Sequence, residues 1–582
     1  MNTEVLKVIY VGRDNSKIEL ALSSYKNIVI LIANNWDDFN YKTTFQTQCQ
    51  IQGKDVELGS IQILIENEKT SSTYLDQLIA GGWSGELPIP ATQYISTPSA
   101  LTFYEQIVGH LNLDVTIDLA VTLRDAGYLT KVKDDADAFR LALTDGFTRS
   151  LQREQGAVKA FLDGWKVFGK QTVLIGNQEF IFQSTANTLL TLHMRFNSAS
   201  PLPHDINVLI GPNGIGKSQL LMQIVKNLLE LNPDNKAAFG FVGKPNFSQI
   251  VVVSYSPFEL FRVDTFEDAQ RRDHDVYRYF GMRGRQPVQS EQGQIFGKIS
   301  LGREFPKKNA AHSLIGCLVD DQKYGAIKDW SKKVATMERV LKSAFSFDRA
   351  AIAVDANTAV GRYFSTMDGI DEPFIDGEFS DEDGNPATER YIPICSDRIS
   401  ELKTTELKDS LRERVGVVFL KDGKPIQLSS GQRLFSYIVI NILGTIRKNS
   451  LVLVDEPELF LHPNLEIDFL RMLKSILASY NSKALIATHS IVTVREIPRD
   501  CVHVLEKTID GVVIKNPPFE TFGGDVQRIS SYVFGDKAVS KPYEDWLKIK
   551  LGEYGSAASL IEALGTDINE ELIIEIHAME KK

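Results

Sequence analysis

Cysteine is scarce in this sequence, with four residues in a chain of 582. The four lie far apart, form no CxxC pair, and do not stand with histidines at the spacing of a zinc site. Such a pattern is typical of a protein in a reducing cytoplasm that holds no structural metal. The cysteines are Cys49, Cys317, Cys395 and Cys501.

Long apolar runs and an excess of positive charge are also absent. Nowhere do about 18 consecutive apolar residues occur, the length that a membrane-spanning helix needs, and the N-terminus lacks the basic and apolar regions of a signal peptide. We therefore expect a cytoplasmic protein with no membrane partner. The 64 lysines and arginines are outnumbered by 75 acidic residues, for a net charge of −11. Any contact with nucleic acid must therefore come from a local patch.

The length of the chain predicts several domains, because one hydrophobic core rarely organises 582 residues. Residues 1–165 are expected to form a β-rich and then helical N-terminal domain. Its first part holds the β-rich runs VLKVIYV, IELAL, NIVILIA and SIQILI, and helical periodicity begins near residue 71. Residues 516–582 are expected to form a helical C-terminal tail.

Residues 166–515 are expected to form an α/β domain, a parallel sheet covered by helices. Strand and helix patterns alternate there through GVVFL, GQRLFSYIVINILGTI, LVLVDE, LEIDFLRMLKSILASY and ALIATHS. Residues 258–400 interrupt this alternation with irregular polar loops, one amphipathic helix and the acidic loop DGEFSDEDGNP. We interpret them as an inserted lobe.

Residues 211–218, GPNGIGKS, fit the P-loop pattern GxxxxGK[ST] and lie between an apolar strand and an amphipathic helix. The glycines let backbone N–H groups and the helix N-terminus surround phosphates. Lys217 would neutralise the terminal phosphates, and the Ser218 hydroxyl would bind Mg²⁺. The candidate ATP-binding residues are Gly211, Pro212, Asn213, Gly214, Ile215, Gly216, Lys217, Ser218 and Gln219.

A second pattern, LVLVDE, places Asp455 and Glu456 directly after a buried strand. Ligands of α/β sheets bind at the carboxyl ends of the strands. This is a Walker B pattern, in which Asp455 would hold the Mg²⁺ shell and Glu456 would activate or orient the attacking water. Outside such a context, an acidic pair after a strand is often a solvated turn.

The order of motifs resembles ABC-type ATPases: the signature-like LSSGQ precedes VLVDEPE, and ALIATHS follows it. The resemblance implies that the signature contacts the γ-phosphate bound to another subunit, so that two copies form a homodimer around two ATP molecules. A capped helix N-terminus is an anion site, which agrees with a contact between the signature and a phosphate. The resemblance also implies that His489 is the switch residue near the γ-phosphate. The signature residues are Ser429, Ser430, Gly431 and Gln432.

The run ELFLHP after the Walker B pair, ending at His462 and Pro463, resembles the SMC, RecF and OLD-like branch. Among its members the chain is most similar to stand-alone bacterial anti-phage defence ATPases such as PtuA of the Septu system. This implies a dimeric switch that controls a separate effector, such as a nuclease. The alternatives are a transporter subunit, a DNA-repair ATPase of the RecF or SMC type, and a scaffold that binds ATP without hydrolysing it.

Two features depart from the family pattern. The strand QIVVVSYS is not followed directly by the glutamine of the family's Q-loop, and Ser254 or Ser256 is the candidate replacement. The inserted lobe, about 140 residues long, is too short for the coiled-coil arms of SMC proteins. We therefore expect a compact relative.

Two further patterns leave alternatives open. Asp381 with Asp383, and the Asp-His-Asp run at 273–275, are candidates for a metal-dependent nuclease or are solvated loops. Residues 271–308 are locally basic and contain Tyr277, Tyr279 and Phe280. We interpret this segment as an exposed loop or a partner-docking surface, with contact to a nucleic-acid backbone as the alternative.

Overall fold

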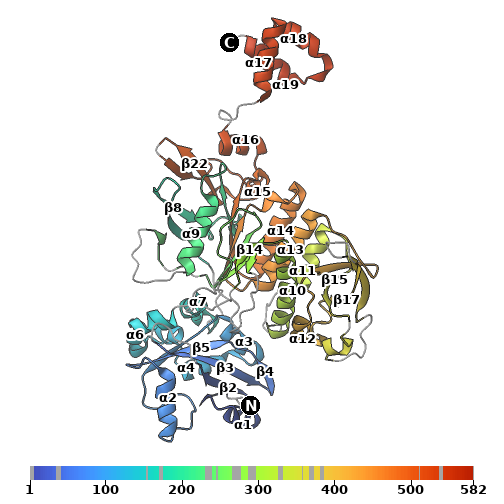
Figure 1. The fold of residues 1–582 in the computed structure, drawn as a ribbon. Helices are drawn as coiled ribbons and strands as arrows, with labels where there is room; N and C mark the ends of the chain where they lie inside the picture. Colours follow the sequence, from blue (N-terminus) through green and yellow to red (C-terminus); the bar gives the residue numbers. More distant parts are fainter. Residues whose placement is uncertain are drawn as a thin grey trace. The chain divides into compact units, whose positions relative to one another are not determined.

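The structure is a computed structural model. It describes residues 6–34, 41–152, 155–168, 175–229, 239–243, 245, 247–264, 277–285, 297–324, 332–356, 358–365, 373–380, 386–509, 511–535 and 542–580. Contacts divide the chain into two compact units, Met1–Gly523 and Gly524–Lys582. Figure 1 shows the course of the chain through them. Over these ranges, no helix has the length and apolar character needed to cross a membrane.

A six-stranded sheet forms the first part of the larger unit, in the order β1-β2-β3-β5-β6 with β4 paired to β3. Strands β1 and β2 are parallel, which requires a crossover between them. That crossover is helix α1 (Asn15–Ser24), capped by Asp14. The expected strand IELAL is therefore wrong, because these residues lie within α1. The strands are β1 (Lys7–Gly12), β2 (Ile28–Ala33), β3 (Thr44–Ile51), β4 (Lys54–Val56), β5 (Ser60–Ile65) and β6 (Tyr94–Pro98).

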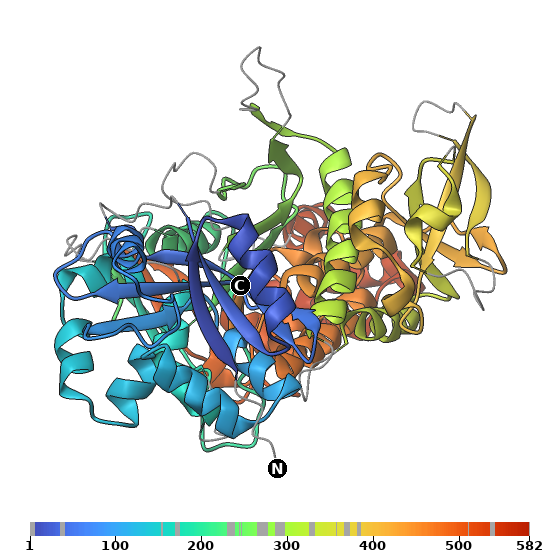
Figure 2. The same cartoon turned by 90° about the horizontal axis from the view of Figure 1, so that it is seen from below.

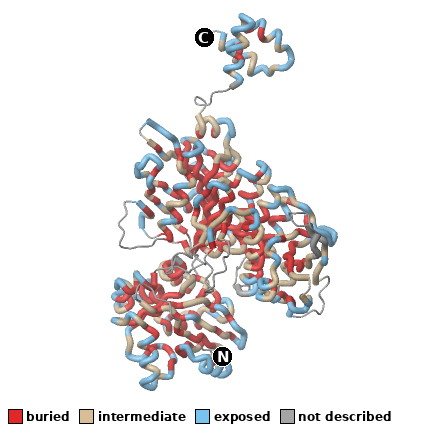
Figure 3. Tube along the Cα trace, in the orientation of Figure 1, coloured by how far each residue is buried: buried red, intermediate tan, exposed pale blue. Residues whose placement is uncertain are grey.

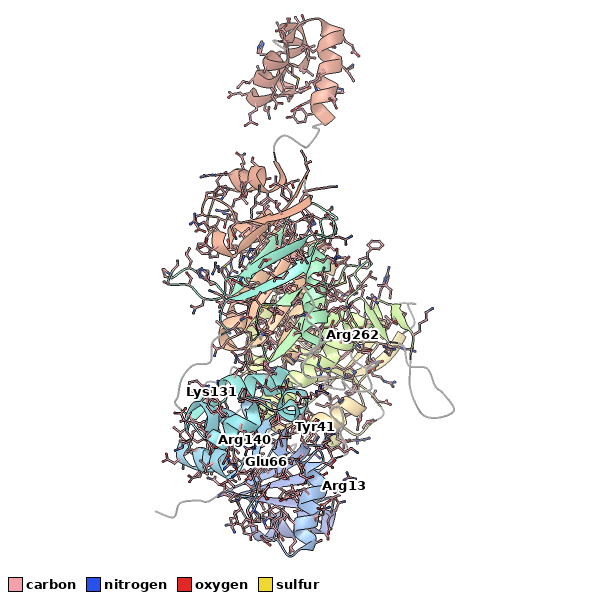
Figure 4. The ribbon with its side chains drawn as sticks, turned by 90° about the vertical axis from the view of Figure 1, so that its left-hand side faces the viewer. Arg13, Tyr41, Glu66, Lys131, Arg140 and Arg262 are labelled. Atoms are coloured by element: carbon pink, nitrogen blue, oxygen red, sulfur yellow. The ribbon has the colours of Figure 1, made fainter. Side chains whose placement is uncertain are left out.

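The helices that follow pack on this sheet, and strand β6 lies among them in the sequence. Aromatic rings fill the shared core, with Phe168 in edge-on contact with Tyr104 and Tyr128. At the surface, Arg140 pairs with Glu66, and both are labelled in Figure 4. The helices are α2 (Ser71–Ala80), α3 (Thr102–His110), α4 (Leu113–Thr122), α5 (Ala126–Lys131), α6 (Ala136–Ala142), the π-helix η1 (Phe147–Leu151), α7 (Gln155–Asp163) and α8 (Trp165–Phe168).

A seven-stranded sheet in the order β12-β11-β20-β21-β9-β22-β23 forms the centre of the second part. All neighbours pair in parallel except the edge pair β22 and β23. The expected α/β architecture is thus confirmed. The strands are β9 (Ile206–Ile210), β11 (Gln249–Ser254), β12 (Tyr277–Gly281), β20 (Ser450–Asp455), β21 (Lys483–Thr488), β22 (Val502–Thr508) and β23 (Gly511–Lys515).

Strands β9, β11 and β20 are buried along their whole length, and Figure 3 shows buried residues gathered at the centre of this part. Parallel strands bury both faces because helices cover them. Helix α9 (Lys217–Leu229) contacts β20 and β21, and a three-stranded sheet, β10-β7-β8, packs beside it. That small sheet comprises β7 (Gln178–Gln183), β8 (Leu189–Met194) and β10 (Gly240–Phe241). Helices α13 (Ser430–Thr445), α14 (Pro463–Ser479) and α15 (Ile491–Arg495) complete this part.

The inserted lobe is more regular than the sequence suggested, so the expectation of irregular loops is wrong. It contains a five-stranded antiparallel sheet in the order β16-β17-β15-β18-β19, and the last two strands extend the lobe to residue 425, beyond the expected end at residue 400. The acidic segment expected to be a loop begins as β16, an edge strand, where polar residues are tolerated because one side faces solvent. The strands are β15 (Arg349–Val354), β16 (Ile375–Ser380), β17 (Pro386–Ile394), β18 (Val417–Lys421) and β19 (Lys424–Pro425).

The run GVVFL was expected to join the parallel sheet, and this is also wrong. It forms β18, which pairs antiparallel with β15. A short apolar run indicates a buried strand but does not identify its partner. The lobe also holds the hairpin of β13 (Arg283–Arg285) and β14 (Ile299–Leu301), η2 (Val360–Tyr363), η3 (Ile399–Glu401) and α12 (Thr404–Asp409).

Helix α10 (Glu304–Tyr324), which the sequence pattern did not reveal, packs closely along α13. Helix α11 (Lys333–Ala344) contacts both, and Figure 2 shows the lobe from another side. The contact between α10 and α13 is tight enough to need glycine. A Cβ added at Gly316 would lie 2.9 Å from the Gly444 carbonyl oxygen, and one at Gly444 would lie 2.3 Å from that of Ser313. The lobe is thereby joined to the helix that carries the signature.

The smaller unit is helical and has a core of its own. It contains α16 (Val526–Ser530), the π-helix η6 (Ser531–Gly535), α17 (Pro542–Tyr554), α18 (Ala557–Leu564), η7 (Gly565–Asp567) and α19 (Glu570–Glu580). The core is formed by Leu547, Ala557, Leu560 and Ile576. Contacts place the start of this unit at Gly524, whereas the sequence pattern placed the helical region at residue 516, directly after β23.

Candidate functional site

The glycine-rich loop 211–218 connects β9 to α9. Gly214 and Gly216 have φ angles of 74° and 105°, in the left-handed region that favours glycine. Gly211 is needed for space, because a Cβ there would lie 2.4 Å from the Leu505 carbonyl oxygen on β22. The loop thus has the backbone conformation and close approach that the P-loop pattern predicts.

Lys217 is 4% exposed, and its ammonium group lies across this loop. Nζ donates to the carbonyl oxygens of Gly211 at 3.1 Å and Pro212 at 3.4 Å, and lies 2.6 Å from Nε2 of His489. Burial lowers the pKa of Lys217, while the carboxylates beyond β20 act in the opposite direction. A buried cation whose partners are neutral carbonyl and imidazole groups is suited to meet an anion such as a phosphate.

Asp455, at the end of β20, is held by two hydroxyl groups. Ser218 Oγ donates to Oδ1 at 2.9 Å, and Ser254 Oγ donates to Oδ2 at 3.4 Å. Burial raises the pKa of Asp455 to about 7, although these hydrogen bonds and the charge of Lys217 oppose the shift. A buried carboxylate beside a hydroxyl is a hard oxygen donor set, and a divalent cation would favour its ionised form.

This donor set fits Mg²⁺ bound partly by the protein and partly by a nucleotide. No group of three or more His, Cys, Asp or Glu side chains suited to a metal occurs in the described ranges. Mg²⁺ in nucleotide sites commonly takes one or two protein ligands, with the rest from phosphates and water. Ser218 and Asp455 are the residues that would hold it.

Glu456 adopts an unusual backbone conformation, with φ 49° and ψ 56°. This left-handed conformation is rare outside glycine and asparagine, and such strain is often found at functional sites. Its amide donates to the Ala487 carbonyl oxygen on β21 at 2.8 Å. Oε1 of Glu456 lies 3.6 Å from Nε2 of His489. The predicted water-activating group and the predicted switch residue are therefore neighbours.

His489 directly follows β21, so its backbone lies at the same sheet edge as Asp455. Burial, together with the charge of Lys217, lowers the pKa of His489 to about 4. The imidazole is therefore neutral near pH 7, and its Nε2 can accept a hydrogen bond from the Lys217 ammonium. A neutral imidazole at this position can also donate or accept a hydrogen bond beside a γ-phosphate.

Ser254, one of the two candidates for the missing Q-loop glutamine, lies at the site. It pairs in register with Asp455 across β11 and β20, and it is fully buried. Ser256 is two residues beyond the end of β11 and is only partly buried. The structure therefore connects Ser254, through its hydroxyl, to the predicted metal ligand.

The signature residues begin α13, with Ser429 as the N-cap. Ser429 and Gln432 form a capping box, in which each side chain bonds the backbone N–H of the other at 3.1 and 3.3 Å. Ser429 and Ser430 are exposed. Next to this helix start lies the segment after the Walker B pair, since a Cβ on Gly431 would lie 3.1 Å from the Phe460 carbonyl oxygen. The helix N-terminus is thus ordered and open to solvent.

Two residues that the sequence reasoning missed are Glu458 and Glu466. Glu458 accepts the backbone N–H of His489, and Glu466 accepts the hydroxyl of Ser490. The signal was present in the motif itself, since Glu458 is the second glutamate of the run DEPE.

The basic segment 271–308 differs from its sequence interpretation. Tyr277, Tyr279 and Phe280 lie on β12 and are buried, so these rings are not exposed on the surface where the nucleic-acid alternative needs them. Alternation along a short strand places such rings in a core as readily as on a surface. The charge is also partly neutralised, because Arg283 pairs with Glu259, Arg285 with Asp264, and Lys308 with Glu413. The nuclease candidates at 273–275, 381 and 383 lie outside the described residues.

A glycine-rich loop between a parallel strand and a helix, with an aspartate ending another strand of the same sheet, separated from the first by β21, defines a P-loop NTPase fold. Comparison with protein families agrees: residues 206–495 match the family described as "AAA domain, putative AbiEii toxin, Type IV TA system". This region is a P-loop ATPase domain. The match begins at β9 and ends with α15, so it includes the inserted lobe.

One relative is protein ea59 of Escherichia phage lambda, which is 24% identical over 531 residues, 88% of this chain and 86% of the phage protein. Among solved structures, a nucleotide-free ATP-binding cassette from an ABC transporter is 14% identical, with a TM-score of 0.25, over 63% of this chain and 98% of that one. UvrA2 from Deinococcus radiodurans is 13% identical, with a TM-score of 0.26, over 66% and 42%. The SMC head domain from Thermotoga maritima is 10% identical, with a TM-score of 0.23, over 60% and 100%.

Proposed function

We propose that this chain hydrolyses Mg-ATP and that two copies, closed around two ATP molecules, act as a conformational switch. The observation that carries the proposal is the meeting of five side chains at one sheet edge. Direct contacts connect Lys217 to His489, His489 to Glu456, and Ser218 to Asp455. These are the residue types that phosphate binding, metal binding and water activation require.

In the proposed reaction each group has a distinct task. The amides of the loop and the Lys217 ammonium bind and neutralise the terminal phosphates. Ser218 and Asp455 would hold Mg²⁺, which supplies charge neutralisation at the β- and γ-phosphate oxygens. Glu456 orients the attacking water or accepts its proton. His489, as a neutral imidazole, hydrogen-bonds near the γ-phosphate. Because it lies beside Glu456, a change in its position on ATP binding would alter the position of Glu456.

The signature supports the two-copy arrangement. Ser429 and Gln432 bond each other in the capping box, and the helix N-terminus behind them is exposed. Such a terminus binds anions, since its backbone N–H groups lack partners within the helix. A second copy of the chain would present its signature to the γ-phosphate at this P-loop. ATP would then join the two copies, and hydrolysis would release them.

We place this switch in bacterial anti-phage defence or nucleic-acid surveillance, controlling a separate effector such as a nuclease, as in PtuA of the Septu system. Two findings support this. The description of the matched family names a putative toxin of a type IV toxin–antitoxin system, and the similar protein ea59 is encoded by a phage. Purification of the chain with its natural partners tests the assignment. Co-elution of a nuclease supports it, and co-elution of a membrane transporter subunit alone contradicts it.

The catalytic proposal is tested by phosphate release from ATP. Wild-type protein and the exposed-lysine control Lys421→Ala should hydrolyse ATP equally. Ser430→Arg should bind ATP, because the P-loop is unchanged, but should lose turnover, because a bulky side chain blocks the helix N-terminus. Normal turnover in Ser430→Arg would contradict the role of the signature. Absence of turnover in the wild-type protein with Mg²⁺, with and without its partners, would contradict hydrolysis.

A further inference from the structure

The segment Thr488–His489–Ser490, which carries the predicted switch histidine, is held by two carboxylates from beyond the Walker B pair. We propose that Glu458 and Glu466 are positioning residues that fix the place of His489 in the ATP site. This inference rests on the proposed function, because it assigns a task to residues that serve His489. Neither glutamate is expected to touch nucleotide.

Glu458 makes the more direct contact. It lies in η4 (Pro457–Leu459), the short turn that follows Glu456. Its Oε1 accepts the backbone N–H of His489 at 2.5 Å. The side chain is largely buried, and burial raises its pKa, whereas the bond from the His489 amide acts in the opposite direction. A buried carboxylate is costly unless it is bonded. Because Oε2 of Glu458 is buried without a hydrogen-bond partner among the described residues, the bond from the His489 amide to Oε1 is what compensates this carboxylate.

Glu466 holds the other end of the same segment. It lies in the first turn of α14 and is 7% exposed. It accepts the hydroxyl of Ser490, and that same hydroxyl caps α15 by accepting the Thr493 amide at 3.2 Å. Thr488 Oγ1 accepts the Ser490 amide at 2.9 Å, so the residues on both sides of His489 are bonded, and so is its own amide. The backbone at His489 has little freedom to rotate.

A fixed backbone at His489 also fixes the position of its imidazole. Its Nε2 lies 2.6 Å from Lys217 Nζ and 3.6 Å from Glu456 Oε1. A displacement of about 1 Å in such a group can reduce a rate about 100-fold. The backbone hydrogen bond to Glu458 therefore sets the distance between the imidazole and the reacting groups.

The same contact couples two strand ends. Glu456, in its left-handed conformation, and Glu458 are separated only by Pro457, whose ring restricts the backbone. A movement of Glu456 on nucleotide binding would therefore move Glu458, and Glu458 would move the His489 backbone. The signature helix lies beside the same segment, next to Phe460. This gives a physical route from the arrival of a second copy to the switch residue.

Steady-state kinetics with a double-mutant cycle test the inference. Glu458→Ala should lower kcat about 10- to 100-fold, with the KM for ATP changed less than about twofold because the P-loop is intact. Glu458→Gln, whose amide oxygen can still accept the N–H, should recover most of that loss. In a His489→Ala background, Glu458→Ala should cost less than about twofold more, since its effect passes through the imidazole. An equal loss in both backgrounds would overturn the proposal.

Hydrogen exchange provides a readout that does not depend on turnover. The amides of 488–490 should exchange at least about tenfold faster in Glu458→Ala and in Glu466→Ala than in wild type. Asp468→Ala, on the same helix as Glu466 but paired with Arg471, is the matched control and should leave this exchange unchanged. Unchanged exchange in both glutamate variants would overturn the positioning role of Glu458 and Glu466 even if the protein hydrolyses ATP. Faster exchange in a protein without turnover would support that role and contradict only hydrolysis.

Discussion

The parallel sheet and the inserted lobe of the ATPase domain are built on different kinds of contact. In the parallel sheet, Asp455 ends a strand, His489 directly follows one, and Ser218 lies in the helix after the glycine-rich loop; the three meet at one sheet edge. In the lobe, the antiparallel sheet pairs β15 with β18, which lies more than sixty residues further along the chain. Both sheets pair segments that are distant in the chain, and β11 and β20 are further apart than β15 and β18. The difference is that short motifs mark the strand ends of the site, whereas the lobe strands carry no such motif.

The largest effect is expected from Glu456→Gln. The variant keeps ATP and Mg²⁺ binding but slows hydrolysis by about 10² to 10⁴, the range for losing assistance from a general base. The ATP-bound two-copy state should then accumulate, as size-exclusion chromatography with ATP would reveal. Glu389→Gln, a carboxylate variant within the lobe sheet, is the control and should retain turnover. If both variants hydrolysed ATP like wild type, the strand-end site would not be the catalytic one.

Lys217→Ala is expected to have the next largest effect. Removing the buried ammonium should weaken ATP binding about 10²- to 10³-fold, because truncating one partner of a desolvated charge pair costs about 2–5 kcal/mol. Isothermal titration calorimetry measures this directly. Lys421→Ala, on lobe strand β18, should bind ATP with wild-type affinity. Wild-type affinity in Lys217→Ala would remove the P-loop assignment.

Ser254→Ala should have a moderate effect that separates metal positioning from nucleotide binding. Loss of the Ser254 hydroxyl leaves Asp455 with the bond from Ser218 alone. Turnover should fall about threefold to tenfold, in line with the loss of one ordinary hydrogen bond worth about 0.5–1.5 kcal/mol, and more Mg²⁺ should be needed for half-maximal activity. Ser256→Ala is the matched control. Equal effects of the two variants would contradict the special place of Ser254.

The smallest effect concerns the joint between lobe and sheet. Gly444→Ala would place a Cβ 2.3 Å from the Ser313 carbonyl oxygen, so α10 and α13 must separate. Overpacking of this kind costs about 1–3 kcal/mol, which urea unfolding would measure. Gly361→Ala, which meets open space, should be neutral or slightly stabilising. A neutral Gly444→Ala would show that the lobe is only loosely attached to the signature helix.

The parallel sheet and its site could be predicted from the sequence better than the inserted lobe. The P-loop, Asp455, Glu456 and His489 could be found because each motif joins a strand, a turn and a residue type within a few positions. Helix α10 and the lobe sheet could not, because an apolar run such as GVVFL does not identify its partner strand. The run IELAL looked like a strand but is the helix that a parallel pair requires. Glu458 was passed over because its task, bonding the His489 backbone, depends on a strand about thirty residues away.

The central claim, that two copies complete each other's ATP sites, is tested most directly by a cross-link. One variant carries Asn213→Cys at the exposed P-loop apex and another carries Ser430→Cys at the signature, both with Glu456→Gln to preserve ATP. The four native cysteines are buried, so they should not compete. The account predicts a disulfide between the two variants that forms with ATP and Mg²⁺ and is absent without nucleotide. If the mixed proteins formed no such cross-link while wild-type protein hydrolysed ATP as a monomer, the two-copy mechanism would be contradicted.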